Sequence, residues 1–244
     1  MWEFELIAER TFNSYFEKLT FKIGEVVKST HSVTAIMADD DNIYFSIGCN
    51  ENCVPQIKAG LRVALCDFIC RDLKSEFMAK NLHLNLDKIR CETLKILCTY
   101  FDREIERSIV LQLLELNASK LNIISFYKFK LIGLQKKWLE LCDLINQNSG
   151  LITNKQNFLD LTKFLLSSID NRCESVILEL GENYIIYHDS FSKVDKVEPI
   201  QVENPAIVLS KLVELNPSLI TIKNGKNTKL VNYLKSIFTT RVCV

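Results

Sequence analysis

Residues 204–244 decide the fold class; they read NPAIVLSKLVELNPSLITIKNGKNTKLVNYLKSIFTTRVCV. Asn204-Pro205 has the chemistry of a helix N-cap followed by a first-turn proline, and Asn216-Pro217 marks the end of the same helix. Past this helix the pattern predicts a strand at 219–222, a helix at 228–238 and a strand at 242–244. A strand, helix and strand in this order predict a right-handed parallel crossover.

A hairpin is predicted just before this segment. Apolar residues alternate over 176–180, Gly181-Glu182 suits a two-residue type II′ turn, and residues 184–187 return as the second strand. The C-terminal region is therefore predicted to be a mixed sheet with helices.

The N-terminal region has strand and helix patterns of its own. Trp2, Phe4 and Leu6 alternate with polar neighbours as in a half-buried strand, and residues 12–27 have helical spacing. Two β-rich runs, 33–37 and 43–47, flank a segment with three aspartates and predict a hairpin. Asp and Asn favour turns because their side chains bond local backbone, so we interpret the aspartates as turn residues rather than a cation site.

The middle of the chain, residues 55–148, has helical patterns almost throughout. Pro55 begins a helix whose apolar face repeats every three or four residues, and residues 89–116 and 123–145 predict further helices, with Asn85 as a candidate N-cap. Beyond this region, residues 156–169 predict one more amphipathic helix. The sequence therefore predicts an α+β protein: an N-terminal strand-helix-hairpin region (1–50), a helical middle (51–150) and a C-terminal mixed sheet with a strand-helix-strand crossover (151–244), which can pack as one compact body.

Composition excludes several classes of protein. The 244 residues include 30 basic and 30 acidic side chains, and a zero net charge disfavours a protein that coats nucleic acid or anionic lipid. No apolar run reaches the roughly 18 residues that a membrane span needs. The first residues carry acids where a signal peptide needs an apolar stretch, so we expect a cytoplasmic protein whose nine cysteines stay reduced.

The cysteines are the first candidate for chemistry. Cys49 and Cys53 lie four apart near a helix start, and Cys66 and Cys70 share one helical face. A zinc or iron–sulfur site usually needs four converging ligands and Cys-x-x-Cys spacing, which the sequence lacks. We therefore favour packing over metal binding and expect no cofactor.

His188 and Asp189 could form a carboxylate-oriented imidazole at a strand end, although such pairs are more often surface features. A second candidate is the loop between the predicted strand at 219–222 and the helix at 228–238. Its residues suit an anion at a helix N-terminus but lack the Walker A pattern, and turn and cap chemistry also explains them; they are Lys223, Gly225, Lys226 and Thr228.

A third candidate is a basic surface within residues 123–145. Phe126, Phe129 and Leu134 are predicted to turn inward, which leaves a solvated face formed by Lys128, Lys130, Lys136 and Lys137. Such a mixture of aromatics and lysines occurs on nucleic-acid surfaces, but the zero net charge makes that partner the disfavoured alternative.

Four segments carry a resemblance to a known family. They are the aromatic and basic helix start ISFYKFKL (124–131), the helix NFLDLTKFL (157–165), the hairpin strands 176–180 and 184–188, and the closing unit 204–244. In these segments the chain resembles the YtxC-like family of sporulation-associated proteins of endospore-forming bacteria. Lys130 stands where the family more often has Arg, which removes bidentate recognition of a carboxylate or phosphate.

The resemblance implies a process rather than a reaction, because the family has no established biochemical activity. We expect a non-enzymatic, cytoplasmic, sporulation-associated protein that acts through contacts with an unidentified protein or with a second copy of itself. The alternative is an enzyme or a protein that binds nucleotide or nucleic acid at the C-terminal strand-loop-helix segment.

Overall fold

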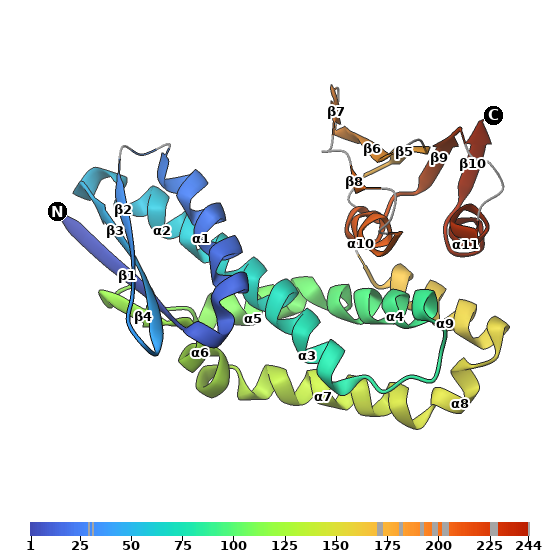
Figure 1. Cartoon of the computed structure of the whole chain (residues 1–244), viewed down its shortest axis with the longest axis horizontal. Helices are drawn as coiled ribbons and strands as arrows, with labels where there is room; N and C mark the ends of the chain where they lie inside the picture. The colour runs from blue at the N-terminus through green and yellow to red at the C-terminus, as the bar shows by residue number, and fades with distance from the viewer. Residues whose placement is uncertain are drawn as a thin grey trace. The chain divides into compact units, whose positions relative to one another are not determined.

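The computed structural model of the chain describes residues 1–28, 30, 32–169, 173–180, 183–190, 193–196, 200–201, 205–224 and 229–243. Its contacts divide the chain into two compact units (Figure 1). The first unit consists of residues 1–77 and 103–140, and the second of residues 78–102 and 141–244. The helical middle of the sequence thus contributes to both units.

The first unit contains a four-stranded sheet in the order β2-β3-β1-β4. β1 (Trp2–Glu9) pairs antiparallel with β3 (Asn42–Cys49), which pairs antiparallel with β2 (Val33–Ala38). β4 (Lys120–Asn122) pairs in parallel with β1 and was not predicted from the sequence. Buried and half-buried residues alternate along β1 and β3, so one face of these two strands belongs to the core.

The turn between β2 and β3 is held by the first of the three aspartates. Asp39 Oδ1 accepts hydrogen bonds from the backbone N–H groups of Asp41 (2.9 Å) and Asn42 (2.7 Å), and Asp39 Oδ2 accepts one from the Tyr44 hydroxyl (2.6 Å). Both the predicted hairpin and the interpretation of the aspartates as turn residues are confirmed.

Helices make up the rest of the first unit. α1 (Asn13–Lys28) follows a short 3₁₀ turn, Arg10–Phe12. After a second such turn, Glu51–Cys53, α2 (Val54–Asp67) continues through a π-helical segment, Phe68–Leu73, into α3 (Lys74–Asn81). The remaining elements are α5 (Arg103–Leu113), α6 (Ile123–Ser125), a second π-helical segment (Phe126–Lys130) and α7 (Ile132–Gln147). α3 and α7 each begin in the first unit and end in the second.

α1 and α2 pack at very short range at one glycine. A Cβ built on Gly60 of α2 would lie 2.2 Å from Cγ1 of Val26 in α1. The absent side chain therefore sets how closely the two helices approach.

The second unit contains a sheet in the order β10-β9-β5-β6-β7, with β8 also paired to β6. β5 (Ser175–Leu180) and β6 (Asn183–Ser190) form the predicted antiparallel hairpin; its turn residues, Gly181 and Glu182, lie outside the described residues. The other strands are β7 (Lys193–Lys196), β8 (Ile200–Gln201), β9 (Leu219–Lys223) and β10 (Thr240–Cys243).

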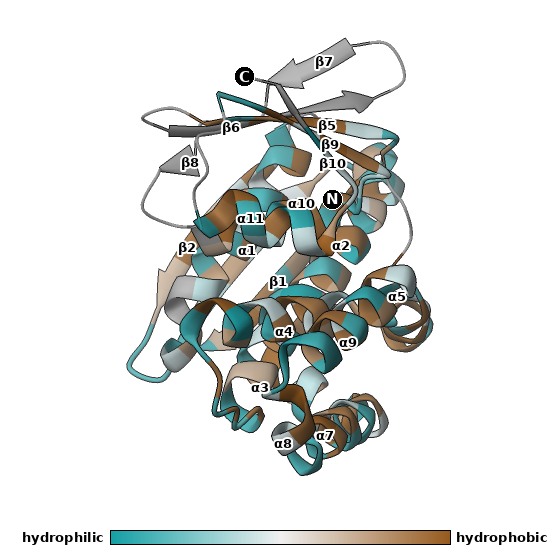
Figure 2. Ribbon diagram, turned by 90° about the vertical axis from the view of Figure 1, so that its right-hand side faces the viewer, coloured by the Kyte–Doolittle hydropathy of each residue, from teal (hydrophilic) through white to brown (hydrophobic). Residues whose placement is uncertain are grey.

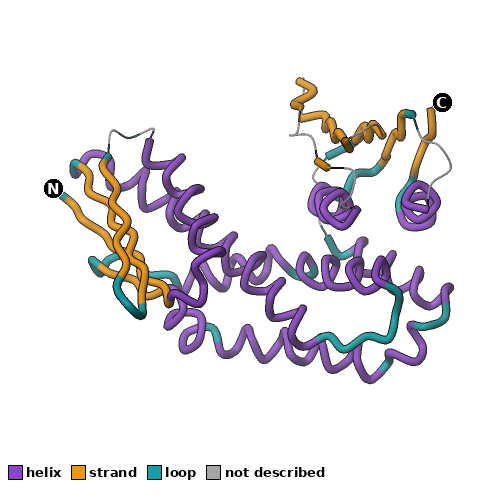
Figure 3. The backbone as a smooth tube through the Cα atoms, viewed as in Figure 1, coloured by secondary structure: helices purple, strands orange, loops and turns teal. Residues whose placement is uncertain are grey.

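β5, β9 and β10 run parallel to one another, and α11 (Lys229–Ile237) connects β9 to β10, so the parallel crossover is confirmed. α10 (Pro205–Leu215) and α11 lie on one face of the sheet (Figures 1 and 3). Buried side chains from both layers form this core: Val176, Leu178, Ile220 and Ile222 from the strands, and Val208, Leu212, Val231 and Leu234 from the helices.

Three more helices complete the second unit: α4 (Lys88–Tyr100), the short α8 (Ser149–Ile152) and α9 (Lys155–Ser167). The helices carry both hydrophobic and hydrophilic stretches, as their amphipathic patterns predicted (Figure 2). The α+β fold class is therefore confirmed.

Two local predictions are wrong. Asp87, not Asn85, caps α4: its carboxylate accepts a hydrogen bond from the backbone N–H of Arg90. The helix predicted over 123–145 is interrupted, because the π-helical segment changes the residue spacing and Leu131 leaves helical geometry. As a result Phe129, which was predicted to turn inward, is 71% exposed.

Within the part of the chain that the structure describes, no helix is both long and apolar enough to cross a bilayer.

Candidate functional site

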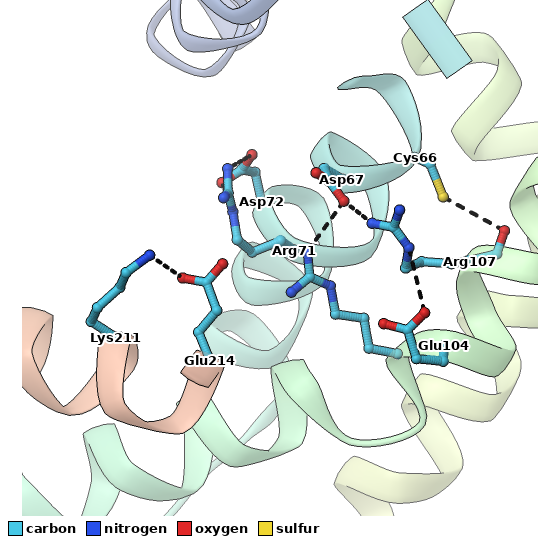
Figure 4. Close-up of polar contacts among 9 residues, drawn as sticks. Cys66, Asp67, Arg71, Asp72, Glu104, Arg107, Lys211 and Glu214 are labelled. Atoms are coloured by element: carbon cyan, nitrogen blue, oxygen red, sulfur yellow. Dashed lines mark hydrogen bonds and ion pairs between the residues drawn. The ribbon is translucent and has the colours of Figure 1, made fainter. Parts of the chain in front are cut away.

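The predicted cysteine pair of the helical middle lies in the core of the first unit. Cys66 and Cys70 are both fully buried, and the Cys66 thiol donates a hydrogen bond to the carbonyl oxygen of Arg107 at 3.6 Å (Figure 4). A hydrogen bond from Cys70, helped by the positive charge of Arg107 and Arg103, lowers the pKa of Cys66. The same hydrogen bond and burial raise the pKa of Cys70. Cys66 is therefore the better thiolate of the two, but solvent does not reach it.

An arginine pair beside these thiols joins α2 to α5. Asp67 Oδ1 accepts a hydrogen bond from Arg107 (Figure 4). It accepts another from Arg103, at 3.2 Å. Arg107 also lies 3.7 Å from Glu104. The guanidinium groups are thus held by carboxylates of their own unit, and this arrangement fixes two helices together.

A second charged cluster is buried deeper in the same unit. Lys74 is 0% exposed, and its Nζ lies 2.7 Å from Oε1 of Glu106. The same Oε1 accepts a hydrogen bond from Nε1 of Trp138 at 2.8 Å, and the Lys74 ammonium lies 5.8 Å from the centre of the Trp138 ring. Sequence analysis did not single out these residues, because a lysine and a glutamate 32 positions apart give no local signal. Their burial indicates a structural role.

Cys49 and Cys53 do not form a ligand pair with other side chains. Cys49 is buried, which raises the pKa of its thiol, and Cys53 donates a hydrogen bond to the carbonyl oxygen of Thr30 at 3.4 Å. Over the described residues, no three His, Cys, Asp or Glu side chains gather in a group that could hold a metal ion.

His188 and Asp189 are consecutive residues of β6, where His188 pairs with Val176 on one side and Asp195 on the other. Their side chains lie outside the described part of the structure, as does His31. His83 is exposed. The catalytic hypothesis for His188 and Asp189 therefore stays a prediction.

All four lysines of the predicted basic surface, Lys128, Lys130, Lys136 and Lys137, are exposed. Lys128 forms an ion pair with Glu9 of β1 at 2.8 Å. The basic surface is thus partly neutralised within its own unit, while the exposed Phe129 stands between two of its lysines.

The predicted anion loop is described in part. Lys223 is exposed at the end of β9, and Asn224 adopts a left-handed conformation (φ 55°). Gly225, Lys226 and Thr228 lie outside the described residues. The helix that follows, α11, lines a cavity with Lys229, Tyr233 and Ser236, and no local signal in the sequence indicated this cavity.

This cavity, of about 630 Å³, lies in the second unit between the N-terminal ends of α4 and α9 and the side of α11, along which it extends from Lys229 to Ser236. We call it the three-helix cavity. Lys88, Lys155 and Lys229, the first residues of these three helices, all line it. Its other lining residues are Asp87, Ile89, Arg90, Thr153, Phe158, Leu159, Tyr233 and Ser236.

Three contacts fix Arg90 in the wall of the three-helix cavity. Its Nε lies 2.5 Å from Asp87 Oδ2, its Nη1 donates to the carbonyl oxygen of Thr153 at 3.1 Å, and its guanidinium lies 5.7 Å from the centre of the buried Phe158 ring. Asp87 is the one acidic residue among the described lining residues. Its carboxylate already accepts hydrogen bonds from the backbone N–H and from Nε of Arg90. Hydrogen bonds and charge from Arg90 lower the pKa of Asp87 despite the opposing effect of partial burial.

Tyr233, which also lines the cavity, is anchored by a hydrogen bond between its hydroxyl and that of Thr93 in α4, at 2.6 Å. Burial raises the pKa of Tyr233 to about 12, so the phenol stays protonated at neutral pH. The cavity therefore combines a neutral, polar wall with four basic side chains.

The three lysines oppose the electrostatics of their helices. A helix N-terminus carries a partial positive charge, and a cation there is unfavourable by about 0.3–1 kcal/mol. Lys88, Lys155 and Lys229 are exposed, and none of them forms an ion pair with a carboxylate of the described residues. An anion in the cavity would relieve this repulsion.

Comparisons with protein-family models, curated proteins and solved structures give no match to this chain.

Proposed function

We propose that the protein is a non-catalytic, cytoplasmic, sporulation-associated protein of the YtxC-like type that acts through protein–protein contacts, the first of which pairs two copies along β2. The resemblance of the chain to that family suggests the process. The exposed edge strand β2 is the observation that supports the contact.

β2 lacks the usual protection of a sheet edge. All six of its residues are exposed, among them Val33 (71%), Ile36 (63%) and Met37 (62%). The strand VTAIMA contains no charged residue and no proline, the two features that most often keep an edge strand from pairing with another chain. One edge of β2 pairs with β3, and no described strand pairs with the other.

The opposite edge of the same sheet is protected. β4 has only three residues, and its Lys120 forms an ion pair with Glu5 at 3.0 Å. Of the two edge strands of this sheet, β2 is therefore the one that can pair with another chain. Two copies that pair antiparallel along β2 cover the free edge of β2 in each copy. Such a contact closes as a two-fold dimer rather than a filament, which favours a second copy as the occupant.

The test measures oligomeric state by light scattering coupled to size-exclusion chromatography. The unmutated protein is expected to elute as a dimer at micromolar concentration, and Ile36→Lys as a monomer, because it places a charge within the new sheet. Ile105→Lys is the matched control: it also replaces an apolar residue of the first unit, 60% exposed but on α5, and should leave the dimer intact. An unmutated protein that stays monomeric over the whole concentration range overturns the pairing.

The process is tested separately, in an endospore-forming host. Deletion of the gene should lower the yield of spores, and the unmutated gene should restore it while Ile36→Lys does not. Normal sporulation after deletion would count against the YtxC-like assignment, whatever the oligomeric state.

A further inference from the structure

We infer that the three-helix cavity binds a small organic phosphate of nucleotide size, with the phosphate held by Lys88, Lys155 and Lys229. This inference concerns the second unit alone and does not depend on the pairing along β2.

Charge is the first argument. Among the described residues, four basic side chains and a single carboxylate line the cavity, in a chain whose total charge is zero. Asp87 is already bound by Arg90, and the three exposed lysines have no ion-pair partner among the described carboxylates. A fixed cluster of this kind attracts a compact anion with more than one negative charge.

Geometry is the second argument. The first residues of three helices line this cavity, and at two of them a cap already accepts from first-turn N–H groups: Asp87 from Arg90 in α4, and Asn154 from Gln156 and Asn157 in α9. Each helix brings a lysine at its first position, so the positive charges of the site come from three separate helices. A phosphate presents several oxygens and can accept from all three at once, whereas a carboxylate has only two oxygens.

The lining residues that are not charged indicate the rest of the ligand. Ile89, Leu159 and the ring of Tyr233 provide an apolar side, and Ser236 adds a hydroxyl. The volume of about 630 Å³ lies within the usual range for small-molecule sites and exceeds what inorganic phosphate would fill. The arrangement therefore fits a phosphate that carries a ring or a sugar.

The position of the lysines gives a sharp discriminating test. If the three lysines have no ligand, the unmutated protein should not bind a phosphate. Replacing them with a neutral residue should then lower the stability of the protein or leave it unchanged. If they form a phosphate site, replacing them removes repulsion at three helix N-termini, so the ligand-free protein gains stability while it loses binding.

The experiment uses the full chain at low salt, with isothermal calorimetry and thermal unfolding in the presence of inorganic phosphate, adenosine 5′-monophosphate or adenosine. Adenosine 5′-monophosphate should bind at least about tenfold more tightly than inorganic phosphate, adenosine should not bind, and added salt should weaken binding. Each single change, Lys88→Gln, Lys155→Gln or Lys229→Gln, should weaken binding about tenfold or more, because each removes one charge-assisted hydrogen bond.

The triple variant should lose the thermal shift produced by adenosine 5′-monophosphate and, without ligand, should melt at a higher temperature than the unmutated protein. Lys163→Gln is the matched control, since Lys163 is an exposed lysine of α9 outside the cavity, and it should change neither quantity. Equal affinity for inorganic phosphate and the nucleotide would contradict the inference that the ligand is an organic phosphate. Absence of binding to both, or binding that survives the triple change, would overturn the site.

Discussion

The ammonium group of Lys74 lies 2.7 Å from Oε1 of Glu106, and both residues are buried in the first unit. Lys74 begins α3 and Glu106 belongs to α5, while the Trp138 indole that shares the same oxygen comes from α7. One carboxylate oxygen thus connects three helices. A buried charge pair of this kind is costly to form and more costly to break on one side only.

We expect Glu106→Leu to lower the free energy of unfolding by about 3–5 kcal/mol, because it leaves the Lys74 ammonium buried without its carboxylate. The double change Lys74→Met with Glu106→Leu should recover most of that loss, since neither charge is then buried. Urea denaturation followed by circular dichroism measures both. The exposed pair of Lys128 and Glu9 is the control, and Glu9→Gln should cost less than about 1 kcal/mol. A double variant no more stable than Glu106→Leu would contradict this interpretation.

Gly60→Ala should destabilise the first unit by about 1–3 kcal/mol, because the new Cβ would overlap the side chain of Val26. A second change, Val26→Ala, should restore part of the loss by making room. Gly24→Ala in α1 is the matched control: nothing lies within 4 Å of its Cβ position, and alanine should stabilise the helix by about 0.5–1 kcal/mol. Thermal unfolding of the variants measures both changes in stability. Equal changes for Gly60→Ala and Gly24→Ala would show that the contact between α1 and α2 does not determine the effect of the substitution.

The hairpin that presents β2 should weaken in acid through Asp39. Hydrogen bonds from the Tyr44 hydroxyl and from backbone N–H groups lower the pKa of Asp39 below its ordinary value of about 4. A lowered pKa means that the stabilisation is complete above the ordinary value and is lost as the pH falls through the pKa of the folded state. Carboxyl chemical shifts followed by NMR should place the Asp39 midpoint below that of an unstructured aspartate. Tyr44→Phe should raise the midpoint; an unchanged midpoint would exclude the hydroxyl as the cause.

Alkylation of the native protein should separate the cysteines by burial. Cys53, Cys91 and Cys173 are half-buried and should react with iodoacetamide before the five buried thiols, which are Cys49, Cys66, Cys70, Cys98 and Cys142. Peptide mass spectrometry at increasing times gives the order, and denaturant should make the rates similar. If Cys66 reacted as fast as Cys53, the Cys66 thiol would be accessible to solvent as well as easily ionised. A redox role for the pair of Cys66 and Cys70 would then replace the structural one.

Local chemistry made much of the fold predictable. The alternation in β1 and β3, Asp39 in its turn, and Pro55 and Pro205 at helix starts each act over a few residues, so the pattern alone indicates the element. Errors occurred where spacing departs from the ordinary helix. The π-helical segment before Leu131 turned Phe129 outward, and no periodicity of 3.6 residues could have foreseen it.

The candidate sites depended on contacts between distant segments. Local patterns were enough to predict the α+β class, the β5–β6 hairpin, the β9–α11–β10 crossover and an anion near the start of α11. Only the tertiary structure brought Lys88, Lys155 and Lys229 to one cavity, placed Lys74 against Glu106, and left β2 at an edge. Caps, turns and periodicity act between neighbours in the chain, so the local sequence is enough to indicate them. A cavity or a buried ion pair exists only after packing has brought together residues that are distant in the sequence.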